Sequence, residues 1–337
     1  MQLYHHPYSL DSQKVRLALE EKGIDYTSHH VNPITAKNMD ASFFRMNSSA
    51  KLPVFQNGSH IIFNTIEIIQ YVERIAAVSL GADDTSFRSR EVVEWMHKIQ
   101  EWNAKYFTLS HVPEKYRISV SKFIRRVIIA RMAESPELAS AYHCKLKDAY
   151  ETEDKLKNPE ALKRSKEHLV RLLDEVETKL KETAYLAGGE FSMADVTLIP
   201  VLARLVLLNL EDEYISSRPN IAEYWVLMQQ RPSYKKVIGK YFSGWRKYKT
   251  LMKTWYFVRF RSLLRRLKRK NWGRIPIPEC KRGVESNCII VFDFVITIYI
   301  LFRSGCAKDR TLVKVCKRGC GNDSSKETGR IMLCFDH

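Results

Sequence analysis

The chain has 337 residues, which is long enough for two domains that each bury a core of their own. Among its seven cysteines only Cys144 precedes residue 280, which excludes a disulfide framework in the body and is typical of a reducing compartment. The net charge of +17 is concentrated, because residues 231–274 hold 16 Lys or Arg and no acidic residue. The basic character therefore belongs to one segment.

The N-terminal sequence reads as a strand from the start. MQLYHH lacks the basic n-region, apolar h-region and cleavage site of a secretory signal. We therefore expect a cytoplasmic protein.

Short apolar runs alternate with helical patterns over the first 80 residues. Strands are predicted at residues 2–5, 26–32, 52–56 and 61–63, and helices at 12–22 and 65–76. Asn57-Gly58 separates the last two strands and is a strong hairpin signal. The order β-α-β-(helical turn)-β-β-α is that of an α/β thioredoxin-like domain, placed at residues 1–78.

A small, polar stretch at residues 77–86 is predicted to be a linker. The pattern that follows is helical, and it defines an all-α C-terminal domain at residues 87–240. Ser192 and Asp195 mark a helix start in FSMAD, because Ser192 can cap a backbone amide and Asp195 can reach back. The helices are predicted at residues 91–109, 119–133, 138–156, 159–181, 193–209 and 221–230.

Ser9 follows the first predicted strand, in the turn before a helix. Backbone amides and the positive end of the helix dipole point at such a position. A hydroxyl there can donate a hydrogen bond to a thiolate, lower the pKa of the thiol and so raise its reactivity. The alternative is that Ser9 is an ordinary helix cap.

Two further short motifs have the same ambiguity. Lys51-Leu52-Pro53-Val54 predicts a cis-proline turn that offers the backbone of Leu52 to an extended peptide, or else an ordinary edge-strand proline. Asn64-Thr65 opens a helix and offers amides to a carboxylate, or else serves as a cap.

The chain resembles the glutathione transferases in the order and spacing of four stretches. They are the segment from Ser9 to Ile24, Lys51-Leu52-Pro53, Asn64-Thr65 and FSMADVTLIP at residues 191–200. The resemblance covers residues 1–240, is of the serine type, and is strongest to the plant class named after tetrachlorohydroquinone dehalogenase. It implies glutathione as co-substrate, no metal, and a homodimer.

The resemblance also implies roles for particular residues. Ser9 would be catalytic and would stabilise the glutathione thiolate. The middle of glutathione would be held by Lys51, Leu52 and Pro53, and its γ-glutamyl end by Asn64 and Thr65. Asn38 is a weaker candidate contact.

Two positions depart from the family pattern. Asn64 replaces an acidic residue, which weakens one contact to the glutathione amino group. Asp11 stands where reductive relatives carry a cysteine, so no mixed disulfide can form there. We therefore expect conjugation of hydrophobic electrophiles or reduction of hydroperoxides rather than reductive dehalogenation. The alternative is a non-catalytic carrier of hydrophobic ligands on the same fold, attached to a membrane surface.

Residues 241–270 form a predicted basic amphipathic helix with aromatic residues on one face. It can cover the active-site cleft, lie on an anionic surface such as that of the plasma membrane, or bind nucleic acid, the least favoured reading. Residues 271–337 are predicted to be a disordered extension. Cys316 and Cys320 lack a second ligand pair, so zinc is not expected.

Two clusters have structural rather than chemical readings. His5-His6 and His29-His30 sit in predicted strands, and we expect them at the surface rather than around a metal. Trp95 and Trp102 are expected either in the helical core or in a hydrophobic substrate wall.

Overall fold

The computed structural model describes residues 1–33, 36–79, 90–111 and 114–242. Most of the predicted linker, nearly all of the predicted basic helix at 241–270 and the whole of 271–337 lie outside these ranges, and the predicted domain limits stay predictions. The strands are β1 Gln2–His5, β2 Thr27–His30, β3 Val54–Asn57 and β4 His60–Ile62.

The four strands form one mixed sheet in the order β2-β1-β3-β4. β1 pairs with β2 in parallel, and the other two pairings are antiparallel. The connecting helices are α1 Leu10–Glu21, the 3-10 turn η2 Lys37–Met39, α2 Ala41–Met46 and α3 Thr65–Ser79. This arrangement confirms the predicted thioredoxin-like order.

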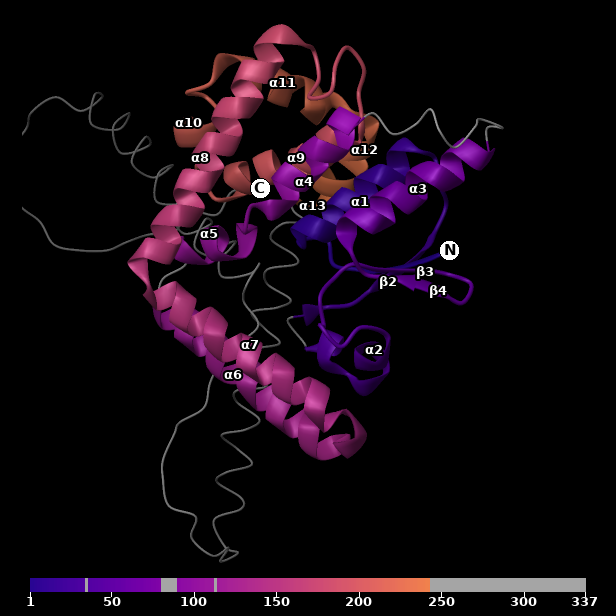
Figure 1. Ribbon diagram of the computed structural model, residues 1–337, viewed down its shortest axis with the longest axis vertical. Coiled ribbons are helices and arrows are strands. Elements are labelled where there is room, and N and C mark those ends of the chain that lie inside the picture. The colour runs from indigo at the N-terminus through magenta and orange to yellow at the C-terminus, as the bar shows by residue number, and fades with distance from the viewer. Residues whose placement is uncertain (34–35, 80–89, 112–113, 243–337) are drawn as a thin grey trace, which may run out of the picture. The chain divides into compact units, whose positions relative to one another are not determined.

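The two faces of the sheet are covered by different helices. α1 and α3 lie side by side on one face, and α2 lies on the other (Figure 1). On the α2 side, Phe43 packs with Val31 and Val54. Because side chains alternate along a strand, the buried Leu3 and His5 of β1 point to the opposite side, towards α1 and α3.

The rest of the described chain is helical, which confirms the predicted all-α region. Its first helices are α4 Arg90–Glu101, α5 Ala104–Ser110, α6 Glu114–Glu134, η3 Pro136–Leu138 and α7 Ala139–Lys157. They are followed by α8 Pro159–Glu182, α9 Met193–Leu207, α10 Glu211–Tyr214 and α11 Pro219–Gln230. The described part ends with α12 Pro232–Tyr234, the π-helical turn η4 Lys235–Gly239 and α13 Lys240–Phe242.

Helix α9 is the centre of the helical region, and all but one of its residues are buried. Asp195 in its first turn has no exposed surface. The carboxylate accepts hydrogen bonds from the backbone N of Ser192 at 2.8 Å, the backbone N of Leu186 at 3.1 Å and the Tyr224 hydroxyl at 2.9 Å. Burial raises the pKa of Asp195 although these bonds oppose the shift. The predicted helix start is confirmed, and its carboxylate also ties α9 to α11.

Helices α6 and α7 form an antiparallel pair, joined through η3 (Figure 1). The pair contacts the α2 region through aromatic and polar groups. Tyr142 stacks on Phe44 with ring centroids 4.0 Å apart, and its hydroxyl donates to the Met39 carbonyl at 2.8 Å. Arg45 pairs with Glu137 at 2.7 Å. This pair of helices is therefore anchored on the sheet domain by contacts between side chains distant in sequence.

Candidate functional site

The sheet register brings the predicted site segments to one edge. Tyr4, near the end of β1, pairs with Val54 at the start of β3, and Phe55 pairs with Ile62 at the end of β4. The turn to α1, the residues before β3 and the turn to α3 therefore all leave the sheet at this edge. Ser9, Pro53 and Asn64 lie in these three segments, so a ligand lying along the edge can meet all of them.

Ser9 is the N-cap of α1 and is partly exposed. Its hydroxyl oxygen accepts a long hydrogen bond of 3.4 Å from the backbone N of Ser12. The capping interaction occupies the oxygen lone pairs but leaves the hydroxyl proton available as a donor. The two readings of Ser9 are therefore compatible, because the same hydroxyl can cap the helix and donate to a bound thiolate.

The turn before Ser9 is fixed by residues that the sequence analysis did not identify. Arg204 of α9 donates to the carbonyl oxygen of Tyr8, and Gln13 donates to the carbonyl oxygen of Pro7 at 2.7 Å. The Tyr8 hydroxyl donates to the carbonyl oxygen of Tyr241 at 3.1 Å. The sequence offered one signal for the contact made by Arg204. This arginine stands in the otherwise apolar helix α9, and a buried charge requires a specific partner.

The bond between Leu52 and Pro53 is cis, which agrees with the first of the two readings of this motif. The segment before it is held by two amide side chains. Asn38 donates to the Ala50 carbonyl at 2.9 Å, and Asn47 donates to the Lys51 carbonyl at 3.0 Å. Asn38 is buried and supports this loop, while the Lys51 side chain is exposed.

Asn64 caps α3 through its side-chain oxygen. This oxygen accepts from the backbone N of Ile66 at 2.9 Å and of Glu67 at 3.3 Å. The exposed Asn64 side chain thus turns its oxygen to the helix, which leaves its NH₂ group to face a ligand. An NH₂ donor suits a carboxylate better than an ammonium group. Thr65 is buried at the first position of the helix.

Asp11 takes part in a polar network between α1 and α4. Gln100 donates to Asp11 at 3.2 Å and accepts from the Lys14 ammonium at 2.6 Å, and Lys14 lies 3.6 Å from the Asp11 carboxylate. Burial lowers the pKa of Lys14, and Asp11 opposes this shift. Asp11, the residue at which this chain differs from the reductive relatives, is therefore the charged partner of the buried Lys14.

The expectation that the histidine pairs lie at the surface is wrong for His5 and His6. They are 1% and 6% exposed, because β1 is the second strand of the sheet and α1 covers its end. Burial, with the nearby Arg16 adding to it, lowers the pKa of His5 to about 3, so the ring is neutral near pH 7. No group of three or more potential ligands that could hold a metal ion occurs in the described residues.

Trp95 and Trp102 are both buried, which agrees with the core reading. The Trp102 indole donates to the carbonyl oxygen of Ser165 and so joins the α4–α5 break to α8. Among the described helices, none combines the length and the apolar character needed to cross a membrane.

Comparisons with known proteins identify the family. Residues 1–74 match the family described as "Glutathione S-transferase, N-terminal domain", and residues 159–224 match "Glutathione S-transferase, C-terminal domain". The chain therefore belongs to the glutathione transferase family. It is 75% identical over 266 residues to "Glutathione S-transferase TCHQD" of Arabidopsis thaliana, a match that covers 79% of this chain and 100% of the relative.

More distant matches agree with this family. The chain is 28% identical over 237 residues to "Tetrachloro-P-hydroquinone reductive dehalogenase" of Sphingobium chlorophenolicum, covering 69% of this chain and 93% of that one. The solved structure of the beta-etherase LigF from Sphingobium sp. strain SYK-6 has a TM-score of 0.53 at 16% identity and covers 71% of this chain and 98% of its own. The glutathione transferase F2 structure from Populus trichocarpa has a TM-score of 0.50 at 21% identity, covering 73% and 98% respectively. These two structures support the fold.

Proposed function

We propose that the protein is a serine-type glutathione transferase whose glutathione site follows the sheet edge described above. The observation that carries the proposal is the meeting, at that edge, of the Ser9 cap, the cis Leu52–Pro53 bond and the Asn64 cap. Two helix N-termini, those of α1 and α3, open there and favour negative charge. Glutathione carries such charge on its thiolate and carboxylates.

In this proposal, Ser9 donates its hydroxyl proton to the glutathione sulfur and favours the thiolate. The backbone of Leu52, beside Pro53, holds the cysteinyl part, and the Lys51 ammonium adds a positive charge. The NH₂ group of Asn64 and the start of α3 at Thr65 hold the γ-glutamyl carboxylate. The Asn64 geometry supports carboxylate recognition and leaves the glutathione ammonium without the acidic partner that the family pattern supplies.

The chemistry follows from the activated sulfur. The thiolate attacks an electrophilic carbon, forms a C–S bond, and the leaving group departs with the electron pair of its bond. With a hydroperoxide, the thiolate attacks the terminal oxygen and breaks the O–O bond, which yields an alcohol and the sulfenic acid of glutathione. A second glutathione then gives the disulfide and water. Neither route needs a thiol at the position of Asp11.

The test is glutathione-dependent turnover by the full chain, with Ser9→Ala as the variant. We expect kcat/KM to fall at least tenfold, or about 1.4 kcal/mol of transition-state stabilisation, while glutathione still binds. The pKa of the bound thiol, measured from its ultraviolet thiolate absorbance, should rise. The control is Ser217→Ala, because Ser217 is an exposed serine whose hydroxyl donates only to the carbonyl oxygen of Glu213 among its described acceptors. A Ser9→Ala enzyme with full activity would refute the catalytic role.

Three finer expectations depend on the resemblance and on the sequence pattern. The protein is proposed to be a homodimer in the cytoplasm, and residues 241–270 are proposed to attach it to an anionic membrane surface. Light scattering tests the dimer. Co-sedimentation of the full chain with anionic and with neutral vesicles tests the attachment, which should weaken with added salt.

A further inference from the structure

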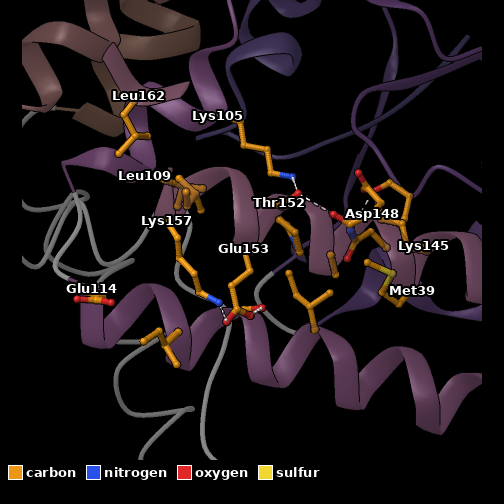
Figure 2. Close-up of a pocket in the computed structure, with 18 of the residues that line it drawn as sticks. Met39, Lys105, Leu109, Glu114, Lys145, Asp148, Thr152, Glu153, Lys157 and Leu162 are labelled. Carbon is orange, nitrogen blue, oxygen red and sulfur yellow. Dashed lines mark hydrogen bonds and ion pairs between the residues drawn. The ribbon is translucent and has the colours of Figure 1, made fainter. Parts of the chain in front are cut away.

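The helical region meets the segments of the proposed glutathione site at two places. One is a cavity of about 520 Å³, the helical cavity, which lies between the loop that follows β2 and helices α5 to α8 (Figure 2). Its lining includes Ala50 and Lys105, and the Lys105 ammonium donates to the Thr152 hydroxyl at 2.9 Å. The other place is the turn before Ser9, which α9 contacts. Because this turn leads directly into Ser9, a contact there can influence the proposed activation of the thiol.

Several of the hydrogen bonds that hold this turn are local. The Ser9 backbone N donates to the His6 carbonyl oxygen at 3.0 Å, and the Gln13 backbone N donates to the Ser9 carbonyl oxygen at 2.9 Å. The carbonyl oxygen of Tyr8 is different, because it accepts from Arg204 of α9, 196 positions further along the chain. The peptide group that joins Tyr8 to Ser9 is therefore held by a side chain of the helical region.

Arg204 is a firm anchor for this peptide group. The arginine is 4% exposed, and it extends from a helix in which all but one residue are buried. Burial of a charged group costs free energy unless hydrogen bonds replace its water. A hydrogen bond from a charged donor is also about twice as strong as one between neutral groups. The Tyr8 carbonyl therefore cannot leave the guanidinium group without a considerable loss of free energy.

The orientation of the Tyr8–Ser9 peptide group decides where the Ser9 hydroxyl lies. Ser9 has an extended backbone, and its hydroxyl oxygen makes only a long hydrogen bond of 3.4 Å with the backbone N of Ser12. This capping bond defines the hydroxyl position loosely, whereas a rotation of the preceding peptide plane would move the side chain of Ser9 with it. A catalytic group must be held within about 0.5 Å of its productive position, so an anchor on that peptide plane matters for catalysis.

We propose that Arg204 is a positioning residue for Ser9. It fixes the peptide group between Tyr8 and Ser9, and so holds the Ser9 hydroxyl where it can donate to the glutathione sulfur. This role rests on the proposed function, because that function assigns the activating hydroxyl to Ser9. Arg204 does not contact glutathione in this scheme, and its effect on the thiol passes entirely through Ser9.

The first test compares Arg204→Met with the parent, both as full chains. Methionine keeps an unbranched side chain in the helix and removes the donor. The pKa of the bound glutathione thiol, measured from its ultraviolet thiolate absorbance, should rise, and kcat should fall about tenfold. The KM for glutathione should change less than about twofold, because the proposed binding contacts lie elsewhere. Arg204→Lys is the second variant, in case the methionine variant does not fold. It keeps the charge but loses the planar donor fork, so it should shift the thiol pKa in the same direction by less.

A double-mutant cycle separates positioning from a direct effect of the guanidinium charge on the sulfur. If Arg204 acts only through the Ser9 hydroxyl, Arg204→Met raises the thiol pKa in the parent but not in the Ser9→Ala background, where the hydroxyl is absent. An equal shift in both backgrounds would mean that the charge acts on the sulfur directly, and it would overturn the positioning role.

The matched control is Arg218→Met. Arg218 also donates to a backbone carbonyl oxygen, that of Tyr214 at 3.0 Å, and its guanidinium pairs with Asp174 at 2.6 Å. Its described contacts do not include the turn before Ser9. The control should therefore lower stability without moving the thiol pKa. Circular dichroism and thermal unfolding establish that each variant is folded at the assay temperature.

The outcomes distinguish this role from the proposed function. If Ser9→Ala leaves both turnover and the thiol pKa unchanged, the proposed function is refuted, and the role of Arg204 with it. If Ser9→Ala raises the thiol pKa but neither Arg204 variant does, only the role of Arg204 is refuted. A shift in Arg218→Met as large as that in Arg204→Met would indicate a general loss of stability and would also overturn the positioning role.

Discussion

The sheet edge and the helical cavity differ in how their polar groups are held. At the edge, helix caps and turns position polar groups through contacts between residues that are close in sequence. Ser9 and Asn64 make such contacts at the N-termini of α1 and α3. In the cavity, Lys105 meets Thr152 across 47 positions of sequence. A site formed by local caps can therefore be found from sequence motifs, whereas a cavity formed by packed helices is visible only in the tertiary structure.

The largest effect is expected where the helical region depends on a single side chain. Asp195→Ala removes the acceptor for the Leu186 and Ser192 amides and the Tyr224 hydroxyl, all of which are then left without this partner. We expect the free energy of unfolding to fall by about 3 kcal/mol or more, measured by chemical denaturation. Asp195→Asn keeps one acceptor and should lose less. Equal losses in the two variants would contradict this account.

At the sheet edge the corresponding effect should be smaller. Asn64→Ala removes the cap of α3 and should cost about 1 kcal/mol of stability. It should also raise the KM for glutathione, because the proposed NH₂ contact to the carboxylate is lost. Asn64→Asp keeps the cap, so it should restore stability, and it exchanges the NH₂ contact to the carboxylate for an acidic partner of the glutathione ammonium. An unchanged KM in both variants would remove Asn64 from the proposed site.

The smallest effect is expected at the contact between α1 and the segment after α11. Glu21 accepts from Arg231 at 2.7 Å, and its pKa is lowered because the bonds to Arg231 and Ser233 outweigh the opposing effect of burial. Since the folded-state pKa lies below the unfolded value, the stabilisation is present above the ordinary pKa of about 4.5 and is lost as pH falls through the folded value. Glu21→Gln should remove this acid-dependent loss, about 0.5 kcal/mol. Urea midpoints at about pH 6 and about pH 4 test it, and an identical pH dependence in both proteins would contradict it.

The accuracy of the sequence predictions follows the same division. The strands flanking Asn57-Gly58 and the start of α9 were predicted because their signals are local. The helix predicted at 91–109 is instead two helices, because Asn103 caps α5 by accepting from the Tyr106 backbone N at 3.3 Å. The Asn103 cap is also a local signal. The apolar residues keep their helical spacing on both sides of Asn103, so the break between the two helices was not predicted.

Other features depend on tertiary packing alone. The burial of His5 and His6 results from the position of β1 inside the sheet and from the helix above it. The hydrogen bond from Arg204 to the Tyr8 carbonyl, next to Ser9, joins residues that are 196 positions apart, and the apolar surroundings of Arg204 gave only a general hint. The cavity combines a loop near the sheet with four helices, so no stretch of sequence could indicate it.

The network around Asp11 also limits how this chain could evolve. A change of Asp11 to cysteine, the residue that reductive relatives use, would remove the carboxylate that lies 3.6 Å from the buried Lys14 ammonium. The single substitution would therefore reduce stability before it could provide a new reaction. A viable route would replace Lys14 by an uncharged residue first, so the order of mutations, rather than their number alone, separates the two chemistries.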